Sequence, residues 1–234
     1  MSQTVLYITS NPMKRRTVER FIRQHVPDFR IASREVAFYE PQTLDEPKVI
    51  TYKALEAWKI FRRPLIVDDA GFYLEEYDCF PGPLAKPTVI SLGWEGMLKL
   101  AAPGFRARVY CRLGYVDQSG MLHHYRGETA GYLDKDMLGP LVDRRGVYAL
   151  LRPDDSNLTI AEMAGTPQAD FYSPRARALR AFVKNTMEIR GIEPKAEIIH
   201  ELDLAGDDKH SVKTDEVIEL NAHVGPEVDR SDDE

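Results

Sequence analysis

The sequence has few cysteines, no glycine-rich phosphate loop and no long apolar run, and each absence excludes a class of protein. Its two cysteines, Cys79 and Cys111, are too few for a disulfide framework and lack the spacing of a metal site, so we expect reduced structural thiols. No stretch reaches the ~18 consecutive apolar residues of a membrane-spanning helix, and no charged leader precedes the first apolar segment. We therefore expect a cytoplasmic protein without membrane contact.

Negative charge is concentrated near the C-terminal end of the chain. The formal net charge of the 234 residues is -6, and residues 195–234 hold 13 acidic against 4 basic residues. The hydrophobic content of 43% is sufficient for one full core in the rest of the chain. The sequence predicts a single domain over residues 1–190 and an acidic, partly disordered C-terminal extension over residues 191–234.

Apolar runs alternate with helical patterns over the predicted domain, which is typical of an α/β fold. Strands are predicted at 5–8 and 34–39, and another begins at Leu65, breaks near Gly71 and continues as a second short strand. A hairpin is predicted with arms at 106–117 and 122–133 and a turn at Gly120. Helices are predicted at 12–25, 45–61, 88–101 and 174–188.

The predicted first helix begins with three cations, although the N-terminus of a helix carries partial positive charge. Asn11 is a favoured N-cap and Pro12 suits the first helical position. Lys14, Arg15 and Arg16 follow, and each cation costs about 0.3–1 kcal/mol unless a negative group compensates. Either all three side chains extend into water, or Lys14 forms an anion site with the backbone N–H groups, because phosphates commonly bind between a strand and a helix.

Acidic residues follow two of the predicted strands. Asp68 and Asp69 end an apolar strand, and Glu40 lies just past another. Adjacent carboxylates at the end of a buried strand repel each other, and a divalent cation would remove that cost. Because successive strand residues point to opposite faces, we choose Asp69 as the cation ligand, with Glu40 joining it and Asp68 as a supporting acid. Alternatively, the aspartates cap a turn and Glu40 is an exposed loop residue.

Six motifs in a fixed order resemble the inosine triphosphate pyrophosphatase family over about residues 3–185. The motifs are TSNPMK, Glu40 followed by YKALEAW, VDDAGFYL, FPGPLAK, RGETAGYL, and LTIAEM followed by SPRARAL. The resemblance implies a mixed twisted sheet flanked by helices, with two lobes around a central cleft, and a homodimer. It also implies Mg²⁺-dependent hydrolysis of a nucleoside triphosphate to the monophosphate and pyrophosphate.

The resemblance implies roles for the residues that match these motifs. Lys14, Asp68 and Asp69 would be catalytic, and Glu40 and Asp69 would hold Mg²⁺. From the residues alone, Lys53 and Lys86 are ordinary surface lysines, whereas in the family they would neutralise phosphate charge. The full set of substrate-binding residues would be Thr9, Ser10, Asn11, Lys14, Lys53, Lys86, Tyr148, Ser173 and Arg175.

The base-recognition region departs from the family pattern. Tyr148 takes the approximate place of an aspartate and Pro174 that of a histidine, and Ser10 stands where glycine is usual. A purine 6-keto group would lose hydrogen-bond partners, so altered or relaxed base specificity is expected. Tyr148 either stacks on a base or belongs to a strand-like core run, and Arg175 either contacts the substrate or lies on a solvated basic helix face.

Two other functions stay open. A catalytically silent nucleotide-binding or regulatory protein on the same scaffold is consistent with the rewritten base region, although the retained acids favour activity. Nucleic-acid binding would use Arg144, Arg145, Arg175 and Arg177. We disfavour it because the chain is acidic and few aromatic residues are interleaved with these arginines.

Overall fold

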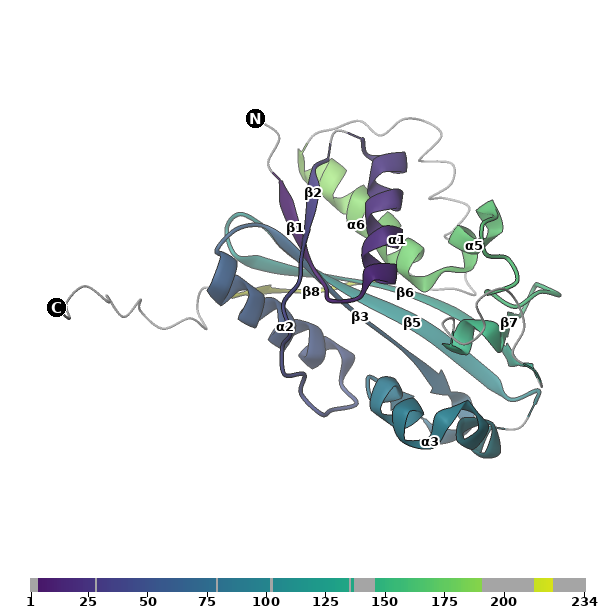
Figure 1. Ribbon diagram of the computed structural model, residues 1–234. Coiled ribbons are helices and arrows are strands. Elements are labelled where there is room, and N and C mark those ends of the chain that lie inside the picture. The colour runs from purple at the N-terminus through teal and green to yellow at the C-terminus, as the bar shows by residue number, and fades with distance from the viewer. Residues whose placement is uncertain are drawn as a thin grey trace.

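The computed structural model describes residues 4–27, 29–78, 80–101, 103–134, 136, 146–190 and 213–220. In this part of the chain, one sheet of eight strands has the order β2-β1-β3-β5-β6-β7, with β4 paired to β3 and β8 to β6 (Figure 1). The strands are β1 Val5–Ile8, β2 Ile31–Arg34, β3 Leu65–Leu74, β4 Pro81–Gly82, β5 Arg106–Val116, β6 Met121–Leu133, β7 Leu151–Pro153 and β8 Lys213–Glu219.

The sheet is mixed, and helices cover both of its faces. The pairs β1–β2 and β1–β3 are parallel, whereas β3–β5, β5–β6 and the remaining pairs are antiparallel. The helices are α1 Pro12–His25, α2 Glu46–Phe61, α3 Ala85–Leu100, α5 Pro167–Tyr172 and α6 Pro174–Arg190, with 3₁₀ turns η1 Glu75–Tyr77 and η2 Gly146–Ala149. The predicted α/β class with a mixed sheet is confirmed.

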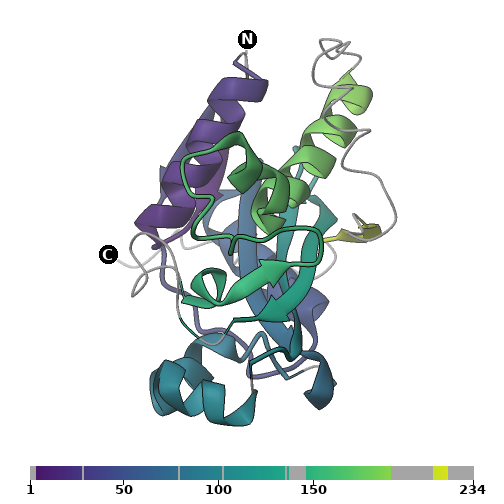
Figure 2. The ribbon, with the colours of Figure 1, turned by 90° about the vertical axis from the view of Figure 1, so that its right-hand side faces the viewer.

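Side-chain alternation along the central strands separates two cores. One core joins the sheet to α1 and α6, which lie together on one side of it (Figures 1 and 2), and it includes Tyr7 and Ile66. The other core lies against α2 and includes Leu6, Leu65 and Val67. Neighbouring residues of β3 therefore face different helices.

A third core occupies the end of the sheet farther from α1 and α6. It joins β3 and β5 to α3, η2 and β7, and it includes Phe72, Met97 and Leu151. Figure 2 shows α3 at the opposite end of the molecule from α1 and α6. The predicted acids lie in the middle of β3, and the start of α3 lies beyond them toward the end of that strand.

Two strand predictions were wrong in their boundaries. The second strand is Ile31–Arg34 rather than 34–39, because β1 has four residues and its parallel ladder ends at Arg34. The third strand does not break at Gly71, because β5 pairs with it from Leu65 to Leu74. The missing side chain at Gly71 lets β4 approach β3 closely, since a Cβ there would lie 2.3 Å from the carbonyl oxygen of Gly82.

Other elements differ from the sequence prediction or were absent from it. Helix α3 begins at Ala85 rather than at residue 88 and contains a kink at Gly93. The segment around Tyr148 is the 3₁₀ turn η2 followed by β7, not one strand. The elements β4, η1, α5 and β8 were not predicted. Strand β8 and the buried Leu220 that follows it lie within the predicted acidic extension. Strand β8 pairs with β6, and the remaining residues of that extension lie outside the described part of the chain.

Helix α6 approaches the sheet closely at Gly127 of β6. A Cβ on Gly127 would lie 2.2 Å from the Pro174 carbonyl oxygen and 2.6 Å from the Arg177 Cβ. We expect Gly127→Ala to lower the free energy of unfolding by roughly 1–3 kcal/mol, because α6 must move away from the sheet. Urea unfolding measures the change.

The matched control is Gly104→Asn. Gly104 has φ +86°, which asparagine tolerates, and within the described part of the chain no atom beyond its two sequence neighbours lies within 4 Å of the place that a Cβ would take there. We expect its effect to stay within about 0.5 kcal/mol. An equal loss in both variants would contradict the close contact at Gly127.

Candidate functional site

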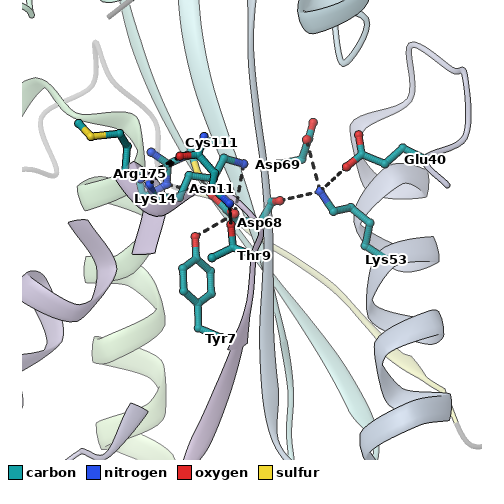
Figure 3. A network of polar contacts seen from close by, with 11 residues as sticks. Tyr7, Thr9, Asn11, Lys14, Glu40, Lys53, Asp68, Asp69, Cys111 and Arg175 are labelled. Carbon is teal, nitrogen blue, oxygen red and sulfur yellow. Dashed lines mark hydrogen bonds and ion pairs between the residues drawn. The ribbon is translucent and has the colours of Figure 1, made fainter. Parts of the chain in front are cut away.

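Asp68 is the centre of a buried polar cluster on the face of β3 toward α1 and α6 (Figure 3). Its side chain is 2% exposed. Oδ1 accepts hydrogen bonds from the Tyr7 hydroxyl at 3.0 Å and from Lys14 Nζ at 3.2 Å. Oδ2 accepts one from Arg175 Nε at 2.9 Å, and Cys111 Sγ lies 3.7 Å away. Both carboxylate oxygens therefore have cationic partners.

These cations determine the ionisation of Asp68. Burial alone would raise its pKa, but the charges of Lys14 and Arg175 outweigh burial and hold the pKa well below its usual range. Asp68 is consequently an ionised anchor that orients two cations.

Asp69 points to the opposite face, where Lys53 of α2 connects it to Glu40 (Figure 3). Lys53 Nζ lies 2.9 Å from Glu40 Oε1 and 3.7 Å from Asp69 Oδ1, and it donates to the Asp68 carbonyl oxygen at 2.9 Å. The two predicted metal ligands therefore share one buried ammonium group. The alternation of side chains along a strand correctly predicted that Asp68 and Asp69 point to opposite faces of the sheet.

Positive charge from three elements converges on Glu40. Burial raises its pKa, but Lys53, Lys14 and Lys86 together lower it below the usual value. The pKa of Asp69 is raised, because burial and the neighbouring Glu40 and Asp68 carboxylates outweigh Lys14 and Lys53. Lys14 and Lys53 thus act on both acids, and Lys86 acts on Glu40.

The structure around the start of α1 shows where the cations of its first turn lie. Asn11 Oδ1 accepts from the N–H groups of Met13 at 2.9 Å and Lys14 at 3.3 Å, and Thr9 Oγ1 accepts from the Asn11 N–H. The predicted N-cap is confirmed. Lys14 finds its compensating anion in Asp68, whereas Arg15 remains exposed to solvent. The predicted residue Ser10 is exposed in the loop before the helix.

Helix α2 is fixed to the sheet two turns before Lys53. Glu46 is 7% exposed and accepts from Arg112 Nε at 3.2 Å and from Arg126 Nε at 2.9 Å. The Tyr73 hydroxyl also donates to it. Because residues 46 and 53 lie on the same side of the helix, this cluster positions the Lys53 ammonium at Asp69.

The three predicted base-region residues line one pocket of about 240 Å³. Tyr148, Ser173 and Arg175 form one side of it, and Arg16 and other residues of the first turns of α1 form the other. Because Arg175 also binds Asp68 and Lys14 belongs to the same part of α1, the pocket adjoins the Asp68 cluster. Tyr148 is half-buried and packs against the third core while lining the pocket.

The basic stretch at the start of α6 is not a solvated face. Arg175 is 8% exposed and Arg177 is 1% exposed. Arg177 Nε donates to the Phe171 carbonyl oxygen at 2.9 Å, which closes the turn between α5 and α6. The predicted nucleic-acid residues Arg144 and Arg145 lie outside the described residues.

Cys111 is a free, buried thiol as predicted, and burial is the main reason that its pKa rises to about 12. Cys79 lies outside the described residues.

Sequence reasoning missed several charged and aromatic residues that complete the site. They are Tyr7, Glu46, Arg112, Arg126 and the ion pair between Arg20 and Asp170, whose atoms are 2.6 Å apart at the pocket. A signal was present, because a charged residue inside an apolar strand, such as Arg112, requires a buried partner. The identity of that partner depends on cross-strand register, which the sequence does not reveal.

Two further features bear on ligands. Among the described residues, no cluster of three or more His, Cys, Asp or Glu side chains is arranged to hold a metal ion. No helix in the described part of the chain combines the length and apolarity needed to cross a membrane.

Comparison with known proteins identifies the family. A model of the Ham1 family matches residues 5–185. The chain belongs to the Ham1 family. This membership confirms the resemblance to inosine triphosphate pyrophosphatases, and the match covers all residues of the Asp68 and Asp69 clusters.

Ham1 relatives from archaea and yeast align over most of the chain. A dITP/XTP pyrophosphatase of Hyperthermus butylicus is 27% identical over 181 residues, which cover 76% of this chain and 92% of that protein. An inosine triphosphate pyrophosphatase of Kluyveromyces lactis is 26% identical over 196 residues, covering 78% of this chain and 96% of that protein.

Solved Ham1 structures share the fold. A HAM1 protein from Coxiella burnetii superimposes with a TM-score of 0.65 at 16% identity, covering 79% of this chain and 98% of that one. The Staphylococcus aureus Ham1 protein gives a TM-score of 0.59 at 15% identity, covering 79% and 100%.

Removal of the Asp68 charge tests the buried cluster. We expect Asp68→Asn to lower the free energy of unfolding by about 3–5 kcal/mol, because buried cations lose their counter-ion. The control Asp170→Asn removes a pair whose Arg20 side chain is 55% exposed, and we expect a loss below about 1 kcal/mol. Similar losses in the two variants, measured by urea unfolding, would contradict the cluster's role.

The same variant changes the pH dependence of stability. Since the folded state lowers the pKa of Asp68, its contribution is complete above about pH 4, the pKa range of an unfolded aspartate, and it is lost as pH falls toward the folded value. Between neutral and acidic pH, the free energy of unfolding should therefore fall less steeply with decreasing pH for Asp68→Asn than for the wild type.

Proposed function

We propose that this protein hydrolyses a nucleoside triphosphate to the monophosphate and pyrophosphate in a Mg²⁺-dependent reaction. The observation that carries the proposal is the placement of Lys14 and Lys53 against the acids of β3 and Glu40. Lys86 adds positive charge that lowers the pKa of Glu40. Phosphoryl transfer depends mainly on positioning and on stabilisation of negative charge, and these are the groups that it requires. The names of the Ham1 relatives support the same reaction class.

The donor set fits magnesium. Glu40 and Asp69 already contact one positive group, the Lys53 ammonium, which places two carboxylates around a single cationic position. Magnesium is commonly held by one or two carboxylates together with waters and substrate phosphates, not by an all-protein cage. Bound there, Mg²⁺ would act as a Lewis acid on phosphate oxygens.

The protein's own groups divide the remaining work. Lys14, at the N-terminus of α1, would bind phosphate where the helix dipole also favours negative charge. Lys86, exposed in the first turn of α3, would bind it from the other end of the site. Asp68 would orient Lys14 and Arg175, because both of its oxygens are already engaged. Thr9, Ser10 and Asn11 would shape the loop around the phosphates.

The pocket of about 240 Å³ would hold the base. It is smaller than the roughly 300–1,000 Å³ of sites that enclose a drug-sized ligand, so it suits a base better than a whole nucleotide. Tyr148 would stack on the base, and Ser173 and Arg175 would contact its edge. Arg175 would thereby couple base binding to Asp68.

The polar lining of this pocket favours relaxed specificity among keto-bearing bases. Arg16, Arg20 and Arg175 supply guanidinium donors, whereas the carboxylate of Asp170 is engaged by Arg20. Guanidinium groups donate and cannot accept, so a keto oxygen is a better partner than an amino group. We therefore propose that several keto bases are accepted and that adenine is disfavoured.

A substrate panel tests the reaction. Purified protein with Mg²⁺ should release pyrophosphate from inosine, xanthosine, guanosine and uridine triphosphates, and less from adenosine triphosphate. Asp69→Asn should lower kcat by at least about 10³-fold, because the loss of a charged ligand costs several kcal/mol of transition-state stabilisation.

The matched control is Asp45→Asn. Asp45 caps α2 through Lys48 N–H, and asparagine caps equally well, so this variant should keep full activity. An active Asp69→Asn variant would contradict the metal assignment. If the protein binds an α,β-imido triphosphate analogue in calorimetry but releases pyrophosphate from none of the triphosphates in the panel, the catalytically silent function is assigned instead.

Tyr148→Ala tests the base pocket. Stacking on an aromatic ring contributes about 1–3 kcal/mol per base and depends little on base identity. We expect KM to rise about tenfold or more for every accepted substrate, with a smaller change in kcat. Tyr132→Ala, at a tyrosine of β6 that is 43% exposed and does not line the pocket, should leave KM unchanged. Unchanged KM in both variants would contradict base stacking.

A further inference from the structure

Tyr110 of β5 has a buried hydroxyl group that the protein leaves unsatisfied. The residue is 0% exposed, and among the described residues its Oη has no hydrogen-bond partner. Other buried tyrosines do have partners, since the Tyr7 hydroxyl donates to Asp68 and the Tyr125 hydroxyl donates to Asn185. A buried hydroxyl without a partner costs about 1–3 kcal/mol, so its retention requires an explanation.

The ring of Tyr110 is held in place on both sides. Tyr73 stacks on it with centroids 5.0 Å apart and an interplanar angle of 18°. The Arg126 guanidinium lies 5.4 Å from the ring centroid. Phenylalanine would make the same ring contacts, so packing alone does not account for the hydroxyl.

The hydroxyl lies on the same face of the sheet as Asp69. Tyr110 pairs with Gly71 and Arg112 pairs with Asp69 in the β3–β5 ladder, so Tyr110 is a diagonal neighbour of Asp69 on that face. A Cβ on Gly71 would lie 2.8 Å from Tyr110 Oη and 2.3 Å from the Gly82 carbonyl oxygen. The glycine therefore lets the hydroxyl reach β4, which leads into α3 and Lys86.

The surroundings keep this hydroxyl protonated. Burial raises the pKa of Tyr110 far above its usual value, and the negative charges of Asp69 and Glu46 raise it further. The group is therefore a hydrogen-bond donor at every physiological pH. Among the described residues, it lacks an acceptor on the side of the sheet where the acids and Lys86 meet.

We propose that Tyr110 is a further substrate-binding residue, whose hydroxyl donates a hydrogen bond to a phosphate oxygen of the bound polyphosphate beside Asp69. The inference rests on the proposed function and adds a residue that the sequence motifs did not indicate. The polyphosphate satisfies a donor that is otherwise buried without an acceptor in the described part of the chain.

The test combines stability and binding in Tyr110→Phe, using the full chain. Without ligand, the urea midpoint of the variant should equal or exceed that of the wild type, because an unsatisfied polar group has been removed. In calorimetry with inorganic pyrophosphate and Mg²⁺, the dissociation constant of the variant should be at least about tenfold higher than that of the wild type, because hydrogen bonds to charged groups are stronger than those between neutral groups. Binding of Mn²⁺ alone should be unchanged.

Tyr125→Phe is the matched control. Its hydroxyl donates to Asn185 at 2.5 Å on the opposite face, so this variant should lose stability and keep its affinity for pyrophosphate. If Tyr110→Phe instead loses stability, or keeps wild-type affinity, or loses affinity for Mn²⁺ alone, the assignment to a phosphate oxygen is overturned. A wild-type protein that binds neither pyrophosphate nor a triphosphate would overturn the proposed function, and this inference with it.

Discussion

The structure depends on two adjacent carboxylates of β3 that point to opposite faces of one sheet. Asp68 and Asp69 cannot share a single local environment, and the two are contacted by cations carried on different helices. The strand is central, with β1 and β5 as its neighbours, and both acids lie in its ladder with β5, just beyond its short ladder with β1. One strand thereby brings the N-terminus of α1, the middle of α2 and the start of α6 to a common point.

This arrangement assigns different energetic roles to the two faces. On the Asp68 face, the buried ion pairs with Lys14 and Arg175 are satisfied within the protein, so they contribute to folding and orientation. On the Asp69 face, the pKa of the carboxyl is raised and the Tyr110 hydroxyl lacks an acceptor among the described residues. That face is the one that a cation and a polyphosphate would complete.

Much of this site could be predicted from local sequence. The N-cap at Asn11 and the divergence of Asp68 from Asp69 follow from short-range rules, and the six motifs carry the resemblance to the family. Partners such as Arg175 for Asp68 and Arg126 for Glu46 could not be predicted, because they are separated by 107 and 80 residues and depend on register and helix placement. The same limit caused the misplacement of β2 and the supposed break at Gly71, both of which are set by pairing with neighbouring strands.

A crystal structure with Mg²⁺ and an α,β-imido nucleoside triphosphate tests the central claim most directly. The account predicts one polyphosphate in contact with Lys14 and Lys86, with the cation bound by Glu40 and Asp69 and the base beside Tyr148. A polyphosphate bound elsewhere, with the Lys53 ammonium still linking Glu40 to Asp69 and no cation between them, would contradict it.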